Sequence, residues 1–267
     1  MADKKFFQEL MAARRYMDAV SLGFVAGIEP DVKFGSVPDA GSGVKTDVWP
    51  NGLAQPIYLF PSDAGDSIEM FAVGTDAQNI TIEGLTAAGV FQTETVALSG
   101  TGGAGGAVAI PGTWRAVDRA FNADSTELAS AVTIQKVGDA TRVYAFITVE
   151  DQQTSQAMFV VPAGKIVLVN NYSTAINKSG GATVTGIFAF RVRKPGEVFR
   201  TQIRYGLQRT GTSNISSDLI VPLLAGPLCQ LKVSATPDAI TTDISAEYSM
   251  WLIDSNLVPA ALLAALS

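Results

Sequence analysis

The 267-residue sequence contains no histidine and only one cysteine, Cys229. The lack of histidine excludes Ser-His-Asp triads, catalysis by a histidine acid or base, and metal sites held by histidine. A single cysteine excludes a disulfide within the chain and a zinc site built from several cysteines. Because Cys229 lies in an apolar stretch, we predict that its thiol is buried and unreactive.

Charged residues are scarce as well. Asp, Glu, Lys and Arg make up 16% of the chain, against about 25% in an average soluble protein. The net charge of −6 argues against a general nucleic-acid binder, because contacts with phosphate need a basic face. A surface poor in charge is often covered by a partner, so we expect an assembly. The alternative is a monomer whose surface is rich in Ser, Thr, Gly and Asn.

Long apolar runs are missing too. The longest run near an end, residues 258–266, is far shorter than the roughly 20 residues of a membrane-spanning helix. The basic residues near the N-terminus are not followed by the apolar core of a secretory signal. We therefore expect no membrane contact, and synthesis in a reducing compartment, where an unpaired cysteine is usual.

The N-terminal region predicts one helix. Apolar residues recur every three or four positions within residues 4–20, which is typical of a helix with one apolar face. These residues are Phe6, Leu10, Ala13, Met17 and Val20. Residues 21–56 contain many Gly and Pro residues and predict an irregular segment. The helix either packs on its own domain or belongs to an arm, residues 1–45, that docks on a neighbouring subunit. In the second case Phe6, Leu10 and Met17 would bind the partner.

From residue 57 onward the sequence predicts strand after strand. Apolar and polar residues alternate in several runs, including residues 67–73, 80–85, 91–98, 183–194 and 244–253. The short loop at residues 86–89 is typical of a β-hairpin. Turn signals recur about every 8–15 residues without helical patterns between the strands, which favours antiparallel sandwiches over parallel βαβ units.

The predicted fold class is all-β, with two antiparallel, jelly-roll-like β-sandwich units and an N-terminal helical arm. The polar stretch at residues 151–156 marks the predicted boundary between the two units. The first sandwich is expected at residues 46–150 and the second at residues 151–267. A short helix is expected within residues 257–266, because Pro259 suits a first turn and Ala and Leu favour helix.

The sequence predicts no catalytic residue, no cofactor and no metal site. Residues 100–105 match the pattern GxGxxG, but a strand-like segment follows instead of the helix that a dinucleotide site needs. The acidic residues Asp63, Asp66 and Glu69, and the adjacent pair Glu150 and Asp151, are expected on solvated loops. A calcium ion shared between subunits stays open as an alternative.

Basic residues gather in one region, residues 191–209. They are Arg191, Arg193, Lys194, Arg200, Arg204 and Arg209. A basic strand pair binds either nucleic acid or the acidic surface of a partner subunit. Because the whole chain is acidic, we predict contacts between subunits, with Arg191, Arg193 and Arg200 as partner-binding residues.

Several short segments resemble a group of tailed-phage virion structural proteins. They are DVW at 47–49, FP at 60–61, IEMFAVG at 68–74, ITIEGL at 80–85, QTETVALSGT at 92–101 and VPAGK at 161–165. The resemblance covers residues 47–165. Departures from the family pattern are Thr86, residues 88–89, Ser99 and a shortened stretch at residues 74–79. These segments are strand and turn signals, so they indicate a fold more firmly than a role.

The resemblance implies a non-enzymatic β protein of a phage virion, made in the bacterial host cytoplasm. We expect a decoration or cement subunit that binds the major capsid protein and other virion proteins. A homo-oligomer is expected, and a trimer would suit sites of local threefold symmetry. The alternatives are a head–tail connector or tail-associated protein, and a receptor- or glycan-binding appendage. An enzyme such as a glycan hydrolase would need two carboxylates that converge in a cleft.

Overall fold

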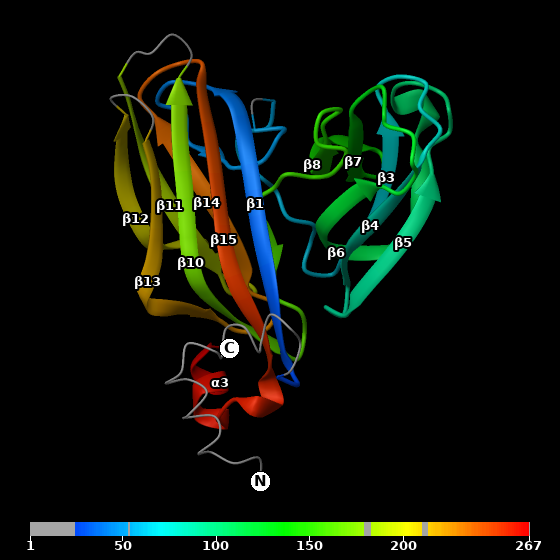
Figure 1. Cartoon of the computed structure of the whole chain (residues 1–267). Helices are drawn as coiled ribbons and strands as arrows, with labels where there is room; N and C mark the ends of the chain where they lie inside the picture. Colours follow the sequence, from blue (N-terminus) through cyan, green and yellow to red (C-terminus); the bar gives the residue numbers. More distant parts are fainter. Residues whose placement is uncertain (1–24, 53, 179–182, 210–212, 267) are drawn as a thin grey trace.

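The computed structural model describes residues 25–266, except residues 53, 179–182 and 210–212. The helix predicted for residues 4–20, with Phe6, Leu10 and Met17, therefore lies outside the described residues. The described chain is all-β, with several antiparallel sheets, and forms two units side by side (Figure 1). In this part of the chain, no helix is both long and apolar enough to cross a membrane.

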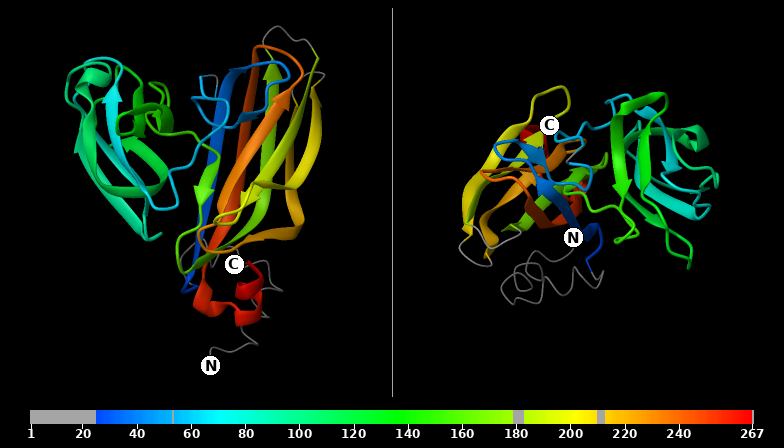
Figure 2. Two further views of the ribbon diagram at one scale, coloured as in Figure 1. Left: turned by 180° about the vertical axis from the view of Figure 1, so that it is seen from behind. Right: turned by 90° about the horizontal axis from the view of Figure 1, so that it is seen from above.

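The larger unit is a sandwich of two antiparallel sheets. One sheet has the strand order β1-β15-β10-β13, and the other has the order β12-β11-β14-β2, with β9 also paired to β14. The bounds are β1 (Ile28–Ala40), β2 (Thr46–Asp47), β9 (Met158–Val160), β10 (Lys165–Lys178), β11 (Val184–Arg193), β12 (Arg200–Arg209), β13 (Ser213–Ala225), β14 (Gln230–Pro237) and β15 (Thr242–Asp254). Figure 2 shows the two sheets as layers, with the smaller unit beside them.

One apolar core fills the space between these two sheets. Alternate residues of β11 point into it, so Phe188 and Phe190 are fully buried while Ile187 is exposed. Tyr172 of β10 and Tyr248 of β15 meet the Phe190 ring edge-on, with ring centroids 5.7 and 5.1 Å away. Such T-shaped pairs stabilise the core beyond simple burial.

The smaller unit is inserted into the middle of one strand of the sandwich. Strands β2 and β9 both run antiparallel to β14 and follow one another along it. The backbone amide of Ala157 donates to the carbonyl oxygen of Val48 at 2.9 Å. The chain therefore leaves the sheet after Val48 and returns to the same strand position at Ala157.

Gly35 of β1 lies against this insertion point. A Cβ atom at residue 35 would lie 2.4 Å from the amide nitrogen of Ala157 and 2.5 Å from the carbonyl oxygen of Val48. Both atoms belong to the backbone, so they cannot turn away as a side chain would. The missing Cβ of glycine is what lets β1 pass so close to the interrupted strand.

The inserted unit is a single six-stranded antiparallel sheet with the order β5-β4-β6-β3-β7-β8. Its bounds are β3 (Asp66–Ala72), β4 (Asn79–Thr86), β5 (Phe91–Ala97), β6 (Val108–Asn122), β7 (Val132–Lys136) and β8 (Asp139–Ile147). The long strand β6 pairs with β3 before Trp114 and with β4 after it. Inward residues from both halves share one core, including Ile68, Ile82 and Ile134. Because a flat sheet cannot bury one face against itself, this sheet curls around its core.

The two units share a smaller apolar cluster, which we call the junction. It is formed by Trp49, Tyr58, Phe60, Leu85, Ala116, Val143, Met158 and Val160, with Phe199 packed against it. The ring centroids of Trp49 and Tyr58 are 5.0 Å apart, and those of Tyr58 and Phe60 are 4.8 Å apart. The junction therefore joins the inserted sheet to the outer face of the five-stranded sheet of the sandwich.

Part of the predicted N-terminal arm is instead a strand. Residues 28–40 form β1, which pairs with β15 from Ile28 opposite Ile253 to Ala40 opposite Thr242. The Gly and Pro residues there suggested an irregular segment. However, β1 lies at the edge of its sheet, where Pro30 and Pro38 can be accommodated. The prediction of an irregular segment across residues 21–56 was therefore wrong for this stretch.

Three other predictions can be compared with the structure. The first unit is one curled sheet rather than a sandwich of two sheets, because β6 keeps the hydrogen bonding continuous. The predicted C-terminal helix is confirmed as the 3-10 turn η2 (Ser255–Leu257) followed by α3 (Ala260–Leu266). The glycine run at residues 100–105 ends in the 3-10 turn η1 (Ala104–Gly106), and β6 follows it directly.

Candidate functional site

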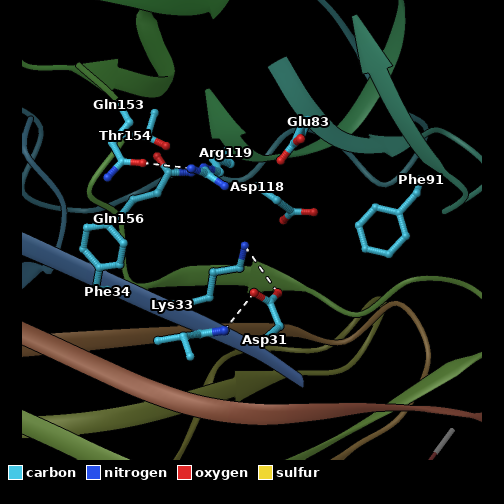
Figure 3. Close-up of a pocket in the computed structure, with 11 residues that line it drawn as sticks. Asp31, Lys33, Phe34, Glu83, Phe91, Asp118, Arg119, Gln153, Thr154 and Gln156 are labelled. Carbon is cyan, nitrogen blue, oxygen red and sulfur yellow. Dashed lines mark hydrogen bonds and ion pairs between the residues drawn. The ribbon is translucent and has the colours of Figure 1, made fainter. Parts of the chain in front are cut away.

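A cleft of about 330 Å³ opens between the two units, and Figure 3 shows the side chains that line it. One wall comes from β1, and the other comes from β4, β5 and β6. Gln153, Thr154 and Gln156 of the returning chain complete the lining. Ligand sites often lie at such boundaries between units, which makes this cleft the candidate functional site.

Asp118 of β6 is the buried acid of the cleft, with 6% of its surface exposed. Burial raises the pKa of Asp118 to about 7; the charge of Lys33 opposes this, and the charges of Asp31 and Glu83 add to it. Among the described residues, the Oδ2 atom of Asp118 and the Oε1 atom of Gln156 have no hydrogen-bond partner. Buried acceptors are normally paired, so each of these oxygens is a position for a water or a donor from a ligand, and the Asp118 oxygen can also hold a proton.

Lys33 reaches into the cleft from β1 on the side opposite Asp118 (Figure 3). Its ammonium lies 3.6 Å from a carboxylate oxygen of Asp31 and 5.1 Å from the centroid of the Phe159 ring. Arg119, on the other wall, donates to the side-chain oxygen of Gln153 at 3.1 Å. Both cations of the cleft therefore have partners, while Asp118 keeps one oxygen unsatisfied.

The cleft combines acids with exposed aromatic rings. Phe34 and Phe91 line it with 43% and 48% of their surfaces exposed. An acid whose pKa lies near neutrality beside a second carboxylate is also an arrangement that acid–base catalysis uses. Within the described ranges, no three acidic or cysteine side chains come close enough together to hold a metal ion.

The acids singled out in the sequence do not converge there. Burial alone would raise the pKa of Asp66, but hydrogen bonds from Tyr144, Ser62 and Lys136 together lower it to about 2. Glu69 accepts a hydrogen bond from Gln135 at 2.9 Å. The expectation of solvated loops was therefore wrong for Asp66 and Glu69, because both belong to strand β3.

The three predicted partner-binding arginines lie in different surroundings. Arg191 lies on the outer face of β11. Arg193 reaches the inserted unit, 4.0 Å from a carboxylate oxygen of Asp63. Arg200 forms an exposed ion pair with Glu197 at 3.2 Å. The buried thiol predicted for Cys229 is confirmed, and burial raises its pKa.

A buried ion pair beside the junction was missed by the sequence analysis. Lys232 of β14 binds Asp47 of β2, and both side chains are almost fully buried. Asp47 also accepts hydrogen bonds from the Ser234 hydroxyl at 2.6 Å and from the backbone amide of Tyr58 at 2.8 Å. The ring of Phe199 covers the ammonium of Lys232 at 4.4 Å from its centroid. The only sequence signal was a lysine between the apolar residues Leu231 and Val233.

Comparisons with known proteins place the chain in no family. No family model matches it, and no curated protein matches it. A solved structure of the Gx strain of infectious bursal disease virus is similar at 10% identity and a TM-score of 0.25, over 88% of this chain and 74% of that chain. The VP2 subviral particle of infectious bursal disease virus is similar at 9% identity and a TM-score of 0.26, over 92% of this chain and 80% of that chain.

Another similar structure is the CBM22 tandem domain of Xyn10C from Paenibacillus barcinonensis. It has 11% identity and a TM-score of 0.22, over 86% of this chain and 92% of that chain. TM-scores of this size carry no argument about function. The inferences about this protein therefore rest on its own strand order, junction and surfaces.

Proposed function

We propose that this protein is a structural component of a virus particle, and that its larger unit is a jelly roll. The strand order is the observation that carries the proposal. If β2 and β9 count as one interrupted strand, the larger unit has eight strands, which can be lettered B to I in chain order. The two sheets then read B-I-D-G and C-H-E-F, which is the jelly-roll arrangement found in viral capsid and lectin domains and in cupins.

The insertion adds to this argument. The inserted unit leaves and rejoins strand C at adjoining positions, so the sandwich keeps its hydrogen bonding while it carries a second unit. One unit can then contact neighbouring subunits while the other projects from them. Because a fold alone does not fix a function, the choice of a virion over a lectin or a cupin rests on the resemblance of the strand and turn segments at residues 47–165.

Within the particle, we propose a decoration or cement position, bound to the major capsid protein and to further copies of this chain. The resemblance and the low charge content support this position. A head–tail connector or tail position is the alternative within the same class. These positions differ in symmetry, so a map of the native particle distinguishes them.

The direct test is the association of the purified full-length chain, followed by sedimentation velocity over a range of concentrations and by electron microscopy. A structural subunit should form oligomers whose population grows with concentration. A chain that remains monomeric at every concentration and does not bind particles would contradict the proposal.

A second candidate function follows from the cleft. Asp118, Glu83 and the exposed ring of Phe91 are the kind of groups that a glycan-binding or glycan-cleaving site uses. We propose that the protein has no enzymatic activity, and a screen of bacterial surface polysaccharides tests this. Cleavage that is lost in Asp118→Asn would favour the enzyme, and binding without cleavage would favour a glycan-recognising appendage.

A further inference from the structure

The outer face of the five-stranded sheet carries a group of basic side chains. In β11 the even-numbered residues face the core, so Ala189 and Arg191 face outward. Arg204 of β12 lies opposite Ala189 in the register, and Ser234 of β14 lies opposite it on the other side. Lys45 precedes β2 at the far edge of the same face. Residues far apart in the sequence thus meet on one surface.

These side chains surround a shallow pocket of about 210 Å³, which we call the basic pocket. Lys45, Arg191 and Arg204 line it together with Thr201, Ser234 and Thr236, and none of the acidic residues that the structure describes does. Within the described chain, none of these three cations forms an ion pair. Burial, and then the charge of Arg191, lower the pKa of Lys45. Positive charge is therefore concentrated here without a counter-charge of its own.

One acid, Asp47, acts on the basic pocket and raises the pKa of Lys45 against the effects of burial and of Arg191. Asp47 lies next to the pocket but is buried and already paired with Lys232. Together Lys45, Arg191, Arg204, Lys232 and Asp47 have a net charge of +3, that is, four positive charges and one negative. The chain as a whole has a net charge of −6, so this face opposes the sign of the rest of the molecule.

A pocket of the opposite sign lies where β1, β10 and β15 of the other sheet meet the chain that follows β8 of the inserted unit. It has a volume of about 430 Å³, and among the described residues its charged lining side chains are Glu150, Asp151 and Asp243. Asp151 accepts a hydrogen bond from Thr148, and Asp243 accepts one from the backbone of Asp39. Within the described ranges, neither forms an ion pair. We call this the acidic pocket. The two pockets share no lining residue.

We propose that the basic pocket of one copy of this protein binds the acidic pocket of the next copy. Opposite charges on complementary surfaces steer association and fix the orientation of the partners. Because the two surfaces are different, the contact is head-to-tail, and its repetition builds a ring or an open array. This contact rests on the proposed role as an assembling structural subunit, and it names the surfaces that would meet.

Charge exchange between the two surfaces tests the contact. One variant carries Lys45→Glu and Arg204→Glu, and a second carries Glu150→Lys and Asp151→Lys; all four side chains are exposed, so the fold should survive. In each variant alone, the two surfaces that should meet between neighbouring copies carry charges of the same sign. Each variant should therefore associate with itself at least tenfold more weakly than the wild type does. An equimolar mixture should associate again, because each variant then meets a surface of opposite charge. The control is Glu127→Lys, a charge reversal at an exposed residue that lines neither pocket.

Sedimentation velocity at low and high salt provides the readout, with thermal unfolding of each variant to show that it is folded. If the wild type associates and both variants associate equally well, the proposed contact is wrong while the structural role stands. If the wild type does not associate with itself, the proposed contact is wrong, and the proposed function fails as well if the chain also does not bind particles. If the Lys45→Glu, Arg204→Glu variant loses binding to a labelled oligonucleotide but keeps self-association, the basic pocket serves nucleic acid and the proposed contact is overturned.

Discussion

The two units of this protein meet in two contrasting regions, the junction and the cleft. Beside the junction, Lys232 and Asp47 are buried and paired, and further hydrogen bonds satisfy Asp47. In the cleft, Asp118 is buried with one oxygen unpaired, while the facing Lys33 is shared with Asp31. A satisfied buried pair favours one arrangement of its surroundings, whereas an unsatisfied acid responds to protons and donors. The region around the junction therefore holds the two units in one arrangement, whereas the cleft responds to pH and to hydrogen-bond donors.

Removal of the Lys232 ammonium beside the junction should have the largest effect on stability. Lys232→Met leaves Asp47 buried without its counter-ion, which should lower the free energy of unfolding by roughly 3–5 kcal/mol. Urea unfolding followed by circular dichroism measures this. The control is Arg200→Met, which breaks an exposed pair and should change stability by about 0–1 kcal/mol. Equal losses of unfolding free energy in the two variants would show that the buried pair of Lys232 and Asp47 matters no more than an exposed pair.

Replacement of Asp118, the buried acid of the cleft, by a neutral residue should instead stabilise the fold. The pKa of Asp118 is 3.8 in an ordinary setting and about 7 in the folded protein. Between these values the folded state holds a proton that the unfolded state has lost, so stability falls as pH rises and levels off above about pH 7. Asp118→Asn should therefore be more stable than the wild type at neutral pH, by up to about 4 kcal/mol. The difference should vanish near pH 4.

Unfolding measured across this pH range checks the prediction, and Asp66→Asn is the matched control. The pKa of Asp66 is lowered to about 2, so its ionised form stabilises the fold above about pH 4, and this stability is lost as the pH falls toward 2. Asp66→Asn should therefore lose stability at neutral pH. If Asp118→Asn shows the same pH slope as the wild type, the account of the cleft is wrong.

A methyl group at the insertion point should have an intermediate effect. Gly35→Ala places a Cβ against the backbone of Val48 and Ala157, which cannot move without disturbing the interrupted strand. Overpacking of this kind should lower the free energy of unfolding by about 1–3 kcal/mol. Gly138→Ser offers a comparison, since a Cβ there meets no atom within 4 Å, although its φ of +70° strains any side chain. If Gly35→Ala left the free energy of unfolding unchanged, β1 would not pass as close to the backbone of Val48 and Ala157 as described.

The smallest effect is expected from Lys33→Met. The ion pair of Lys33 with Asp31 is partly exposed, so stability at neutral pH should change by less than about 1 kcal/mol. However, Lys33 lowers the pKa of Asp118, so its loss should move the titration of Asp118 to higher pH. Carboxyl NMR measures this midpoint. An unchanged midpoint would show that Lys33 does not face Asp118 as in Figure 3.

Local strand patterns could be predicted from the sequence because period-2 alternation reflects burial of one face. The runs at residues 67–73, 80–85 and 91–98 correspond to β3, β4 and β5, and those at 183–194 and 244–253 correspond to β11 and β15. The hairpin between β4 and β5 also follows from its turn. These features depend on neighbouring residues alone.

Features that depend on distant pairing could not be predicted. Strand β1 contains Gly and Pro, and only its place at a sheet edge explains why they are tolerated. The interrupted strand shows just two residues in β2, too few to form a pattern. Likewise, no local pattern indicates that Lys232 pairs with Asp47 or that Lys45 and Arg204 line one pocket. The cluster of basic residues at 191–209 predicted a basic surface that includes Arg191. It did not predict that Lys45 belongs to the same surface.

The central claim is that this protein acts by assembling with other subunits. The most direct measurement is a cryo-EM map of virus particles purified from the cells that make this chain. The account predicts density for both units in repeated positions on the particle, with the outer faces of the sandwich against neighbouring subunits. Particles that lack the chain altogether, together with a purified chain that stays monomeric, would contradict it.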